Sequence, residues 1–215
     1  MLNGKRLSIL GDSISTYRGV SDDETANATL IYNPYRYKEP FPAEKTYWGR
    51  LIERLGLLLC VNNSFSGGNL SGRDNSNAGV NRAKNLARDD GTEPDIIILF
   101  MGINDLGRGI DPAYFGADYS LTLKRIGGLY PGAKVCCVNL PDRDIFLKAR
   151  AELFNGEISK AVKEAGENFF IADLFGSRLN NDFYYMNTTD GLHPDEDGMA
   201  VIAEVIEKAI LEKTK

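Results

Sequence analysis

Five short apolar runs recur along the chain, each bounded by glycine or polar residues. The strongest contains Ile96–Phe100, which is apolar throughout, as is typical of a parallel strand covered on both faces. The runs therefore predict five strands, at Arg6–Leu10, Leu57–Val61, Asp95–Met101, Ala133–Leu140 and Asn168–Leu174.

Between these runs, apolar residues recur at the spacing of a buried helix face. Weaker helical patterns cover Asn77–Arg88 and Tyr119–Leu129. Strands that alternate with helices predict a doubly wound α/β domain, whose functional loops follow the carboxyl ends of the strands. We expect the strand order 2-1-3-4-5. The clearest helical sets are Tyr47, Trp48, Leu51, Ile52 and Leu55; Phe154, Ile158, Ala161, Val162 and Ala165; and Met199, Ile202, Ala203, Ile206 and Ile210.

One long segment, at about residues 17–45, interrupts the alternation with many aromatic residues and prolines. Loops of this length in a compact domain are usually functional, but the aromatic residues could equally pack on the domain. Since no Pro/Gly/Ser-rich linker divides the chain, we expect residues 1–215 to form one domain. The aromatic residues of the segment are Tyr17, Tyr32, Tyr35, Tyr37 and Phe41.

The composition is that of an ordinary globular protein, with 43% hydrophobic and 26% charged residues. A net charge of -5 without long basic runs predicts no nucleic-acid or membrane partner. The apolar stretch Leu7–Leu10 is too short for a signal-peptide core, so we expect a cytoplasmic protein. A secreted protein whose signal peptide has been removed would have the same sequence. Cys60, Cys136 and Cys137 lie in apolar runs, which favours small buried hydrophobes.

Two polar blocks directly follow predicted strands. Gly11-Asp-Ser13 follows the first strand, so the Ser13 hydroxyl is expected at the carboxyl edge of the sheet. Gly102-Ile-Asn104-Asp105 follows the third strand, where the Asn104 amide could donate to a developing oxyanion. Each block alone is also an ordinary turn, because Ser, Asn and Asp bond their own backbone. We interpret Asp12 and Asp105 mainly as residues that brace these loops.

A third block, Asp190-Gly-Leu-His193-Pro194, precedes the last predicted helix, where Pro194 suits the first helical position. His193 is the only histidine of the chain. A neutral imidazole is a suitable base for a serine hydroxyl, and a carboxylate on its other ring nitrogen fixes the tautomer. Together with Ser13, this block indicates a Ser-His-Asp hydrolase. The single histidine and the three expected buried thiols form no convincing transition-metal cluster, so no metal is predicted.

A fourth block, Asn62–Gly68, follows the second strand. Its small residues allow close backbone approach, so the Ser64 N–H could be a second oxyanion donor. The same residues would also make a good turn between a strand and a helix.

In this order, the four blocks resemble the signature blocks of the SGNH superfamily, also called GDSL hydrolases. The resemblance spans nearly the whole chain. It implies a flavodoxin-like three-layer α/β/α sandwich and a serine hydrolase that needs no metal or organic cofactor. The chain has no Gly-x-Ser-x-Gly, which argues against an α/β-hydrolase nucleophile elbow.

The resemblance also assigns roles to individual residues. Ser13 would be the nucleophile and first oxyanion N–H, Asn104 the side-chain oxyanion donor, His193 the base and Asp190 its orienting acid. The chain departs from the family at one position, because Ser64 stands where the second block usually has glycine. A backbone N–H is available from serine as well, so this departure concerns the geometry of the loop and the clearance for a substrate.

These features predict an esterase that removes acyl groups from a small or carbohydrate-like substrate. The aromatic segment could form a wall for sugar rings, which favours a carbohydrate O-acetyl esterase, or it could line a short acyl pocket. We expect Tyr17, Gly67 and Gly68 to contact the substrate.

Other functions remain open from the sequence. A thioesterase or lysophospholipase of the same superfamily is the enzymatic alternative. An inactive ligand-binding module on the same fold is the alternative from another class, although the complete set of candidate catalytic residues argues against it. Flavin binding is less favoured, because the loop after the first strand lacks a Ser/Thr run that could bind a phosphate.

Overall fold

The computed structural model describes residues 2–20, 32, 41–142, 146–179 and 187–215. Five parallel strands form one sheet in the order β2-β1-β3-β4-β5, which confirms the predicted fold class and strand order. The central strand β3 is buried along its whole length, as its continuous apolar sequence predicts. The strands are β1 (Arg6–Gly11), β2 (Leu58–Ser64), β3 (Ile96–Phe100), β4 (Lys134–Val138) and β5 (Phe169–Ala172).

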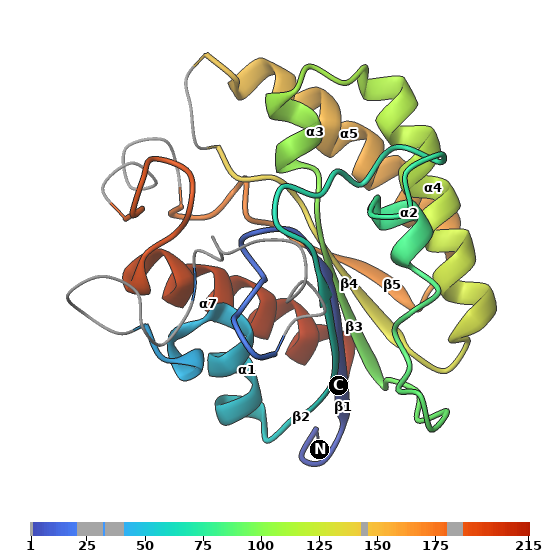
Figure 1. Cartoon of the computed structure of the whole chain (residues 1–215), viewed down its shortest axis with the longest axis vertical. Coiled ribbons are helices and arrows are strands. Elements are labelled where there is room, and N and C mark those ends of the chain that lie inside the picture. The colour runs from blue at the N-terminus through green and yellow to red at the C-terminus, as the bar shows by residue number, and fades with distance from the viewer. Residues whose placement is uncertain (1, 21–31, 33–40, 143–145, 180–186) are drawn as a thin grey trace.

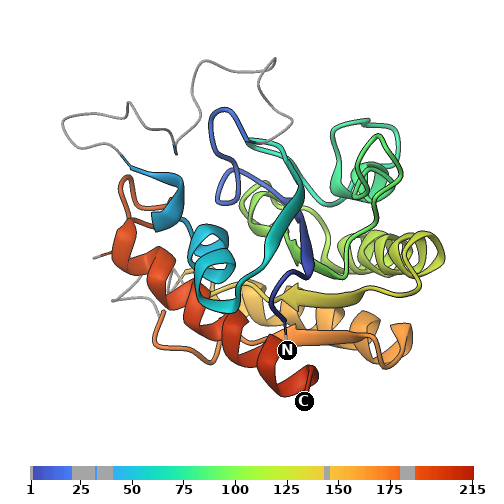
Figure 2. The same cartoon turned by 90° about the horizontal axis from the view of Figure 1, so that it is seen from below.

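Helices cover both faces of the sheet, which makes the three layers of an α/β/α sandwich (Figure 1). The helices α1 (Tyr47–Leu55) and α7 (Glu196–Lys213) pack together on one face. On the other face, α4 (Pro112–Leu129) packs between α2 (Gly79–Arg82) and α5 (Lys148–Ala165). Figure 2 shows the same layers from below. Among the described residues, no helix is long and apolar enough to cross a membrane.

Local capping explains where several helices begin and end. The Thr46 hydroxyl accepts the Gly49 N–H at the start of α1, and Gly56 ends the helix in the left-handed region at φ 67°. Asp195 caps α7 by accepting the N–H groups of Asp197 and Gly198. Pro194 therefore precedes the cap, and its predicted place as the first helical residue is wrong.

Three further segments differ from the sequence-based prediction. The helix expected over Asn77–Arg88 is only the short α2, because the Tyr130 hydroxyl accepts the Leu86 N–H at 2.9 Å and donates to the Lys84 carbonyl at 2.7 Å. Tertiary contacts thus replace helical ones there. The helix expected at Tyr119–Leu129 begins earlier, at Pro112, where Asp111 provides an N-cap. Around Asn104, where the sequence also allows a turn, the chain forms the short helix α3 (Ile103–Gly107).

The aromatic segment contributes to the core where it is described. Tyr17 packs edge-on against Trp48, and its hydroxyl donates to the Phe41 carbonyl at 2.9 Å. Tyr32 is fully buried and packs against the ring of Phe41. The structure therefore supports the packing alternative for these residues. The other aromatic residues of the segment, Tyr35 and Tyr37, lie outside the described residues.

Candidate active site

Ser13 lies directly past the end of β1, as predicted, and is almost completely buried. The turn that holds it starts at Gly11, where a Cβ atom would lie 2.5 Å from Ser15 Cβ, so only glycine fits without a shift. The Asp12 carbonyl then accepts the Ser15 and Thr16 N–H groups, and the Thr16 hydroxyl donates to the Ser13 carbonyl at 2.9 Å. These bonds fix the backbone on both sides of the Ser13 hydroxyl.

His193 lies in the loop that leads into α7, and the fold brings it to Ser13 from 180 residues away. Its carbonyl accepts the Thr189 N–H at 2.8 Å, and Thr188 and Pro194 form an isolated antiparallel bridge beside it. The loop is therefore a closed, hydrogen-bonded turn that carries the imidazole.

The side chains of Ser13, His193 and Asp190 form one hydrogen-bonded chain. His193 Nε2 is 2.9 Å from Ser13 Oγ, and His193 Nδ1 is 2.8 Å from Asp190 Oδ2. The other carboxylate oxygen of Asp190 accepts the backbone N–H of His193 at 2.8 Å. With Nδ1 donating to the carboxylate, Nε2 is left as an acceptor for the serine proton.

Hydrogen bonds from His193 keep the Asp190 carboxyl ionised. Burial by itself raises the pKa of the Asp190 carboxyl, but the bonds from the His193 backbone and imidazole outweigh it, so the pKa lies below its usual range. An ionised carboxylate on Nδ1 stabilises the imidazolium that forms when Nε2 takes a proton.

Asn104 lies in the first turn of α3, at the same edge of the sheet as Ser13. Its side-chain Nδ2 donates to the Gly68 carbonyl at 3.0 Å, which joins the loop after β3 to the loop after β2. An amide nitrogen carries two N–H groups, so a second one remains for a ligand. The two loops that the sequence assigns to the oxyanion site are therefore in contact.

Ser64 is the last residue of β2, and its hydroxyl donates to Asn62 Oδ1 at 2.6 Å. Successive N–H groups of a strand point to opposite sides, and the next N–H, that of Phe65, donates to the Gly11 carbonyl in β1. The Ser64 N–H therefore faces the outer edge of the sheet, away from β1. This orientation corrects the expectation that Ser64 supplies the second oxyanion N–H.

Gly67 and Gly68 form the tight turn that follows β2. The Gly68 N–H donates to the Phe65 carbonyl at 3.0 Å, and Gly67 has a φ of 70°, which fits the third position of a type II turn. Arg108 holds this turn from outside by donating to the Gly67 carbonyl at 2.8 Å. The Gly67 N–H takes no part in the hydrogen bond of the turn.

Tyr17, for which a substrate contact is predicted, packs against the domain. Its ring is only 5% exposed, and its hydroxyl is bonded to the Phe41 carbonyl. It therefore braces the base of the aromatic segment, and its contact with a substrate stays a prediction.

Asp12 and Asp105 are buried carboxyls beside Ser13 and Asn104. Asp105 accepts the N–H groups of Leu70 and Ser71 at 2.7 and 2.9 Å, as expected for a residue that braces a loop. Burial raises the pKa of Asp12 to about 7, against the lowering effects of the Ile14 N–H and the Arg82 charge. Sequence analysis gave no indication of Arg82, because its partners lie far apart in the chain.

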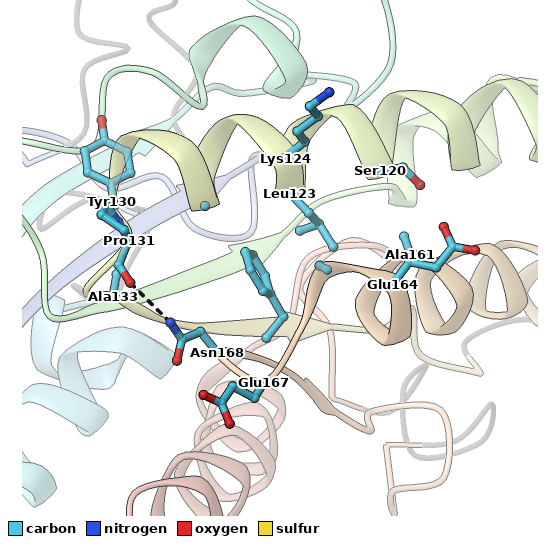
Figure 3. A pocket seen from close by; sticks show the side chains of 13 residues that line it. Ser120, Leu123, Lys124, Tyr130, Pro131, Ala133, Ala161, Glu164, Glu167 and Asn168 are labelled. Atoms are coloured by element: carbon cyan, nitrogen blue, oxygen red, sulfur yellow. Dashed lines mark hydrogen bonds between the residues drawn. The ribbon is translucent and has the colours of Figure 1, made fainter.

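The described residues contain no group of three or more His, Cys, Asp or Glu side chains that could hold a metal ion. A pocket of 510 Å³ lies between α4, α5 and the start of β5, and Figure 3 shows Lys124 and Glu164 at its rim. Asn168 closes its floor by donating to the Pro131 carbonyl at 3.2 Å. Because this pocket lies where β4 and β5 begin, it is at the opposite edge of the sheet from Ser13.

Comparison with known proteins identifies the family of the chain. The model of the GDSL-like Lipase/Acylhydrolase family matches residues 9–201. Comparison with curated protein sequences gave no significant match.

Solved structures share the fold over nearly the whole chain. A protein of Bacteroides ovatus described as a GDSL-like lipase has a TM-score of 0.75 at 22% identity, covering 99% of this chain and 100% of its own. A similar protein of Bacteroides uniformis has a TM-score of 0.71 at 25% identity, covering 95% and 94%. A carbohydrate esterase family 2 enzyme of Corynascus thermopiles, which carries an added carbohydrate-binding domain, has a TM-score of 0.67 at 22% identity, covering 98% and 66%.

Proposed function

Because the chain belongs to the GDSL-like lipase/acylhydrolase family, we propose that it hydrolyses short-acyl carboxylic esters through a covalent intermediate on Ser13. The observation that carries this proposal is the hydrogen-bonded chain from Ser13 through His193 to Asp190. It provides a nucleophile, a base and an orienting carboxylate in the arrangement that acyl transfer requires.

In the first step, Ser13 Oγ attacks the ester carbonyl while His193 Nε2 takes the hydroxyl proton. The tetrahedral intermediate collapses, the C–O bond to the alcohol breaks, and the imidazolium gives its proton to the leaving alcohol. Water then attacks the acyl-serine, with His193 again acting as base, and the acid is released. Asp190 stays ionised throughout and stabilises the charged imidazole.

The oxyanion would be bound by the Ser13 N–H, by Asn104 Nδ2 and by the Gly67 N–H. Gly67 replaces Ser64 in this role, because the Ser64 N–H faces the outer edge of the sheet. The bond from Asn104 to the Gly68 carbonyl holds the side-chain donor and the glycine turn together. Donors fixed in advance stabilise the developing charge without reorganisation cost.

The acyl group that we propose is short, and the panel of esters described below tests its length directly. A carbohydrate esterase among the structural neighbours favours a sugar as the alcohol part of the ester.

The test is a panel of acetylated sugars and synthetic esters from acetyl to octanoyl, assayed with the native protein and with Ser13→Ala. We expect the native protein to prefer acetyl esters, and Ser13→Ala to lose at least about a thousandfold in kcat. A preference for octanoyl esters would favour a thioesterase or lysophospholipase. Full activity of Ser13→Ala would overturn the mechanism, and an inactive native protein would favour the ligand-binding module.

A further inference from the structure

Arg82, in the short helix α2, is an almost completely buried arginine, 6% exposed. Its five N–H groups meet five acceptors. Nε donates to the Asn77 carbonyl at 2.9 Å, Nη1 to the carbonyl and side-chain oxygens of Asn63 at 2.6 and 2.9 Å, and Nη2 to the Gly11 carbonyl at 2.8 Å and the Met101 sulfur at 3.4 Å. A guanidinium with all donors engaged is held rigidly.

Four of these five acceptors lie at the carboxyl ends of three neighbouring strands. Gly11 ends β1 two residues before Ser13, Asn63 is next to the end of β2, and Met101 directly follows β3. One side chain therefore connects the three strand ends that carry the nucleophile, the glycine turn and Asn104.

The guanidinium also lies directly under the glycine turn. A Cβ atom on Gly68 would lie 3.4 Å from Arg82 Nη2, and the Gly68 carbonyl is the acceptor for Asn104 Nδ2. The guanidinium thus lies beside the turn whose carbonyl accepts the Asn104 amide, and we expect its displacement to disturb that turn.

The positive charge of Arg82 also favours an oxyanion site at these strand ends. Two carboxyls, Asp12 and Asp105, are buried nearby, and the Arg82 charge opposes the rise in the pKa of Asp12 that burial causes. A buried cation beneath the oxyanion loops offsets this negative charge at the point where a negative oxyanion would form.

We infer that Arg82 is a positioning residue of the oxyanion site, which it acts on through Gly11, Gly68 and Asn104. This inference rests on the proposed function. Arg82 contacts the backbone behind the site rather than the substrate, so its loss should lower kcat and leave KM nearly unchanged. Lysine cannot replace it, because one ammonium carries three donors on a flexible stem and cannot reach three strands at once.

The test compares Arg82→Lys with Arg88→Lys, in the native background and in Asn104→Ala. Arg88 is the control, because it too donates to β2 carbonyls, those of Leu59 and Cys60, but it is exposed and lies away from the strand end. Thermal unfolding of each variant shows whether it is folded at the assay temperature.

We expect Arg82→Lys to lower kcat at least about tenfold with KM within about twofold, and Arg88→Lys to change neither. In the Asn104→Ala background, Arg82→Lys should cost less than about threefold, because the group it positions is already absent. Asn63→Ala, which removes one acceptor of the guanidinium, repeats the test if Arg82→Lys does not fold, and should show the same dependence on Asn104.

The inference is overturned if Arg82→Lys keeps kcat within about twofold, or if its loss is the same with and without Asn104. Ser13→Ala, assayed in parallel, separates this from the proposed function. An inactive Ser13→Ala with a fully active Arg82→Lys would reject only the role of Arg82, whereas an active Ser13→Ala would reject the serine mechanism itself.

Discussion

Tyr32 packs edge-on against His193, with the ring centroids 6.4 Å apart and the ring planes at 78°. Its hydroxyl donates to the carbonyl of Pro194, the residue after His193, at 2.8 Å. Tyr32 thus contacts the loop that carries the imidazole in two ways, by its ring and by a hydrogen bond to the backbone.

Tyr32→Phe should keep the ring contact and lose the bond to Pro194. A lost buried hydrogen bond costs about 1 kcal/mol of stability or somewhat more. We also expect kcat to fall several-fold, because the His193 loop loses a hydrogen bond that holds it in place. Tyr17→Phe is the matched control, since it removes a similar bond, to the Phe41 carbonyl, without contact to the His193 loop. Equal kcat values for the two variants would contradict this role of Tyr32.

Asn104→Ala removes the proposed side-chain oxyanion donor. Loss of one such donor costs about 3 kcal/mol of transition-state stabilisation, so kcat should fall about a hundredfold with little change in KM. Asn104→Asp keeps the shape of the side chain but replaces the donor with a charged acceptor, and should be at least as damaging. Steady-state kinetics on an acetyl ester measures both. An Asn104→Asp enzyme with native kcat would show that Nδ2 does not bind the oxyanion.

Asp12 should make stability depend on pH. The pKa of Asp12 is raised in the folded protein to about 7. Its contribution to the stability of the fold is therefore fully present below about pH 4 and is lost as the pH rises through 7. Asp12→Asn has no such titration. From pH 5 to pH 8, the wild type should lose about 2 kcal/mol of unfolding free energy relative to the variant. Urea unfolding of both proteins measures the difference, and parallel pH profiles would exclude a raised pKa.

Asp95 should show the opposite pH dependence. It accepts bonds from Lys5 and from the backbone and side chain of Arg6, which join the starts of β1 and β3. Burial by itself raises its pKa, but these partners lower it to about 2. Its contribution is therefore present above about pH 4 and lost as the pH falls through 2. Asp95→Asn should cost about 1 kcal/mol at pH 7, because the group is partly solvated, and clearly less at pH 2. A cost that is constant with pH would contradict this.

The sequence predicts the sheet well because buried parallel strands leave a direct pattern of apolar runs. The candidate site could also be predicted, because Ser13 and Asn104 each follow a predicted strand and His193 precedes a predicted helix. The direction of the Ser64 N–H could not be predicted from the sequence, because it depends on the register between β1 and β2. The roles of Arg82 and Tyr32 could not be predicted either, because the partners of both side chains are set by the tertiary fold.

Covalent labelling of Ser13 tests the central claim most directly. The folded native protein is treated with a fluorophosphonate probe, the labelled residue is located by mass spectrometry of peptides, and esterase activity is followed in the same sample. The account predicts one adduct on Ser13, loss of activity in proportion to labelling, no adduct in Ser13→Ala, and much slower labelling in His193→Ala. Full esterase activity after complete labelling of Ser13, or an adduct on another residue that accounts for the loss of activity, would contradict it.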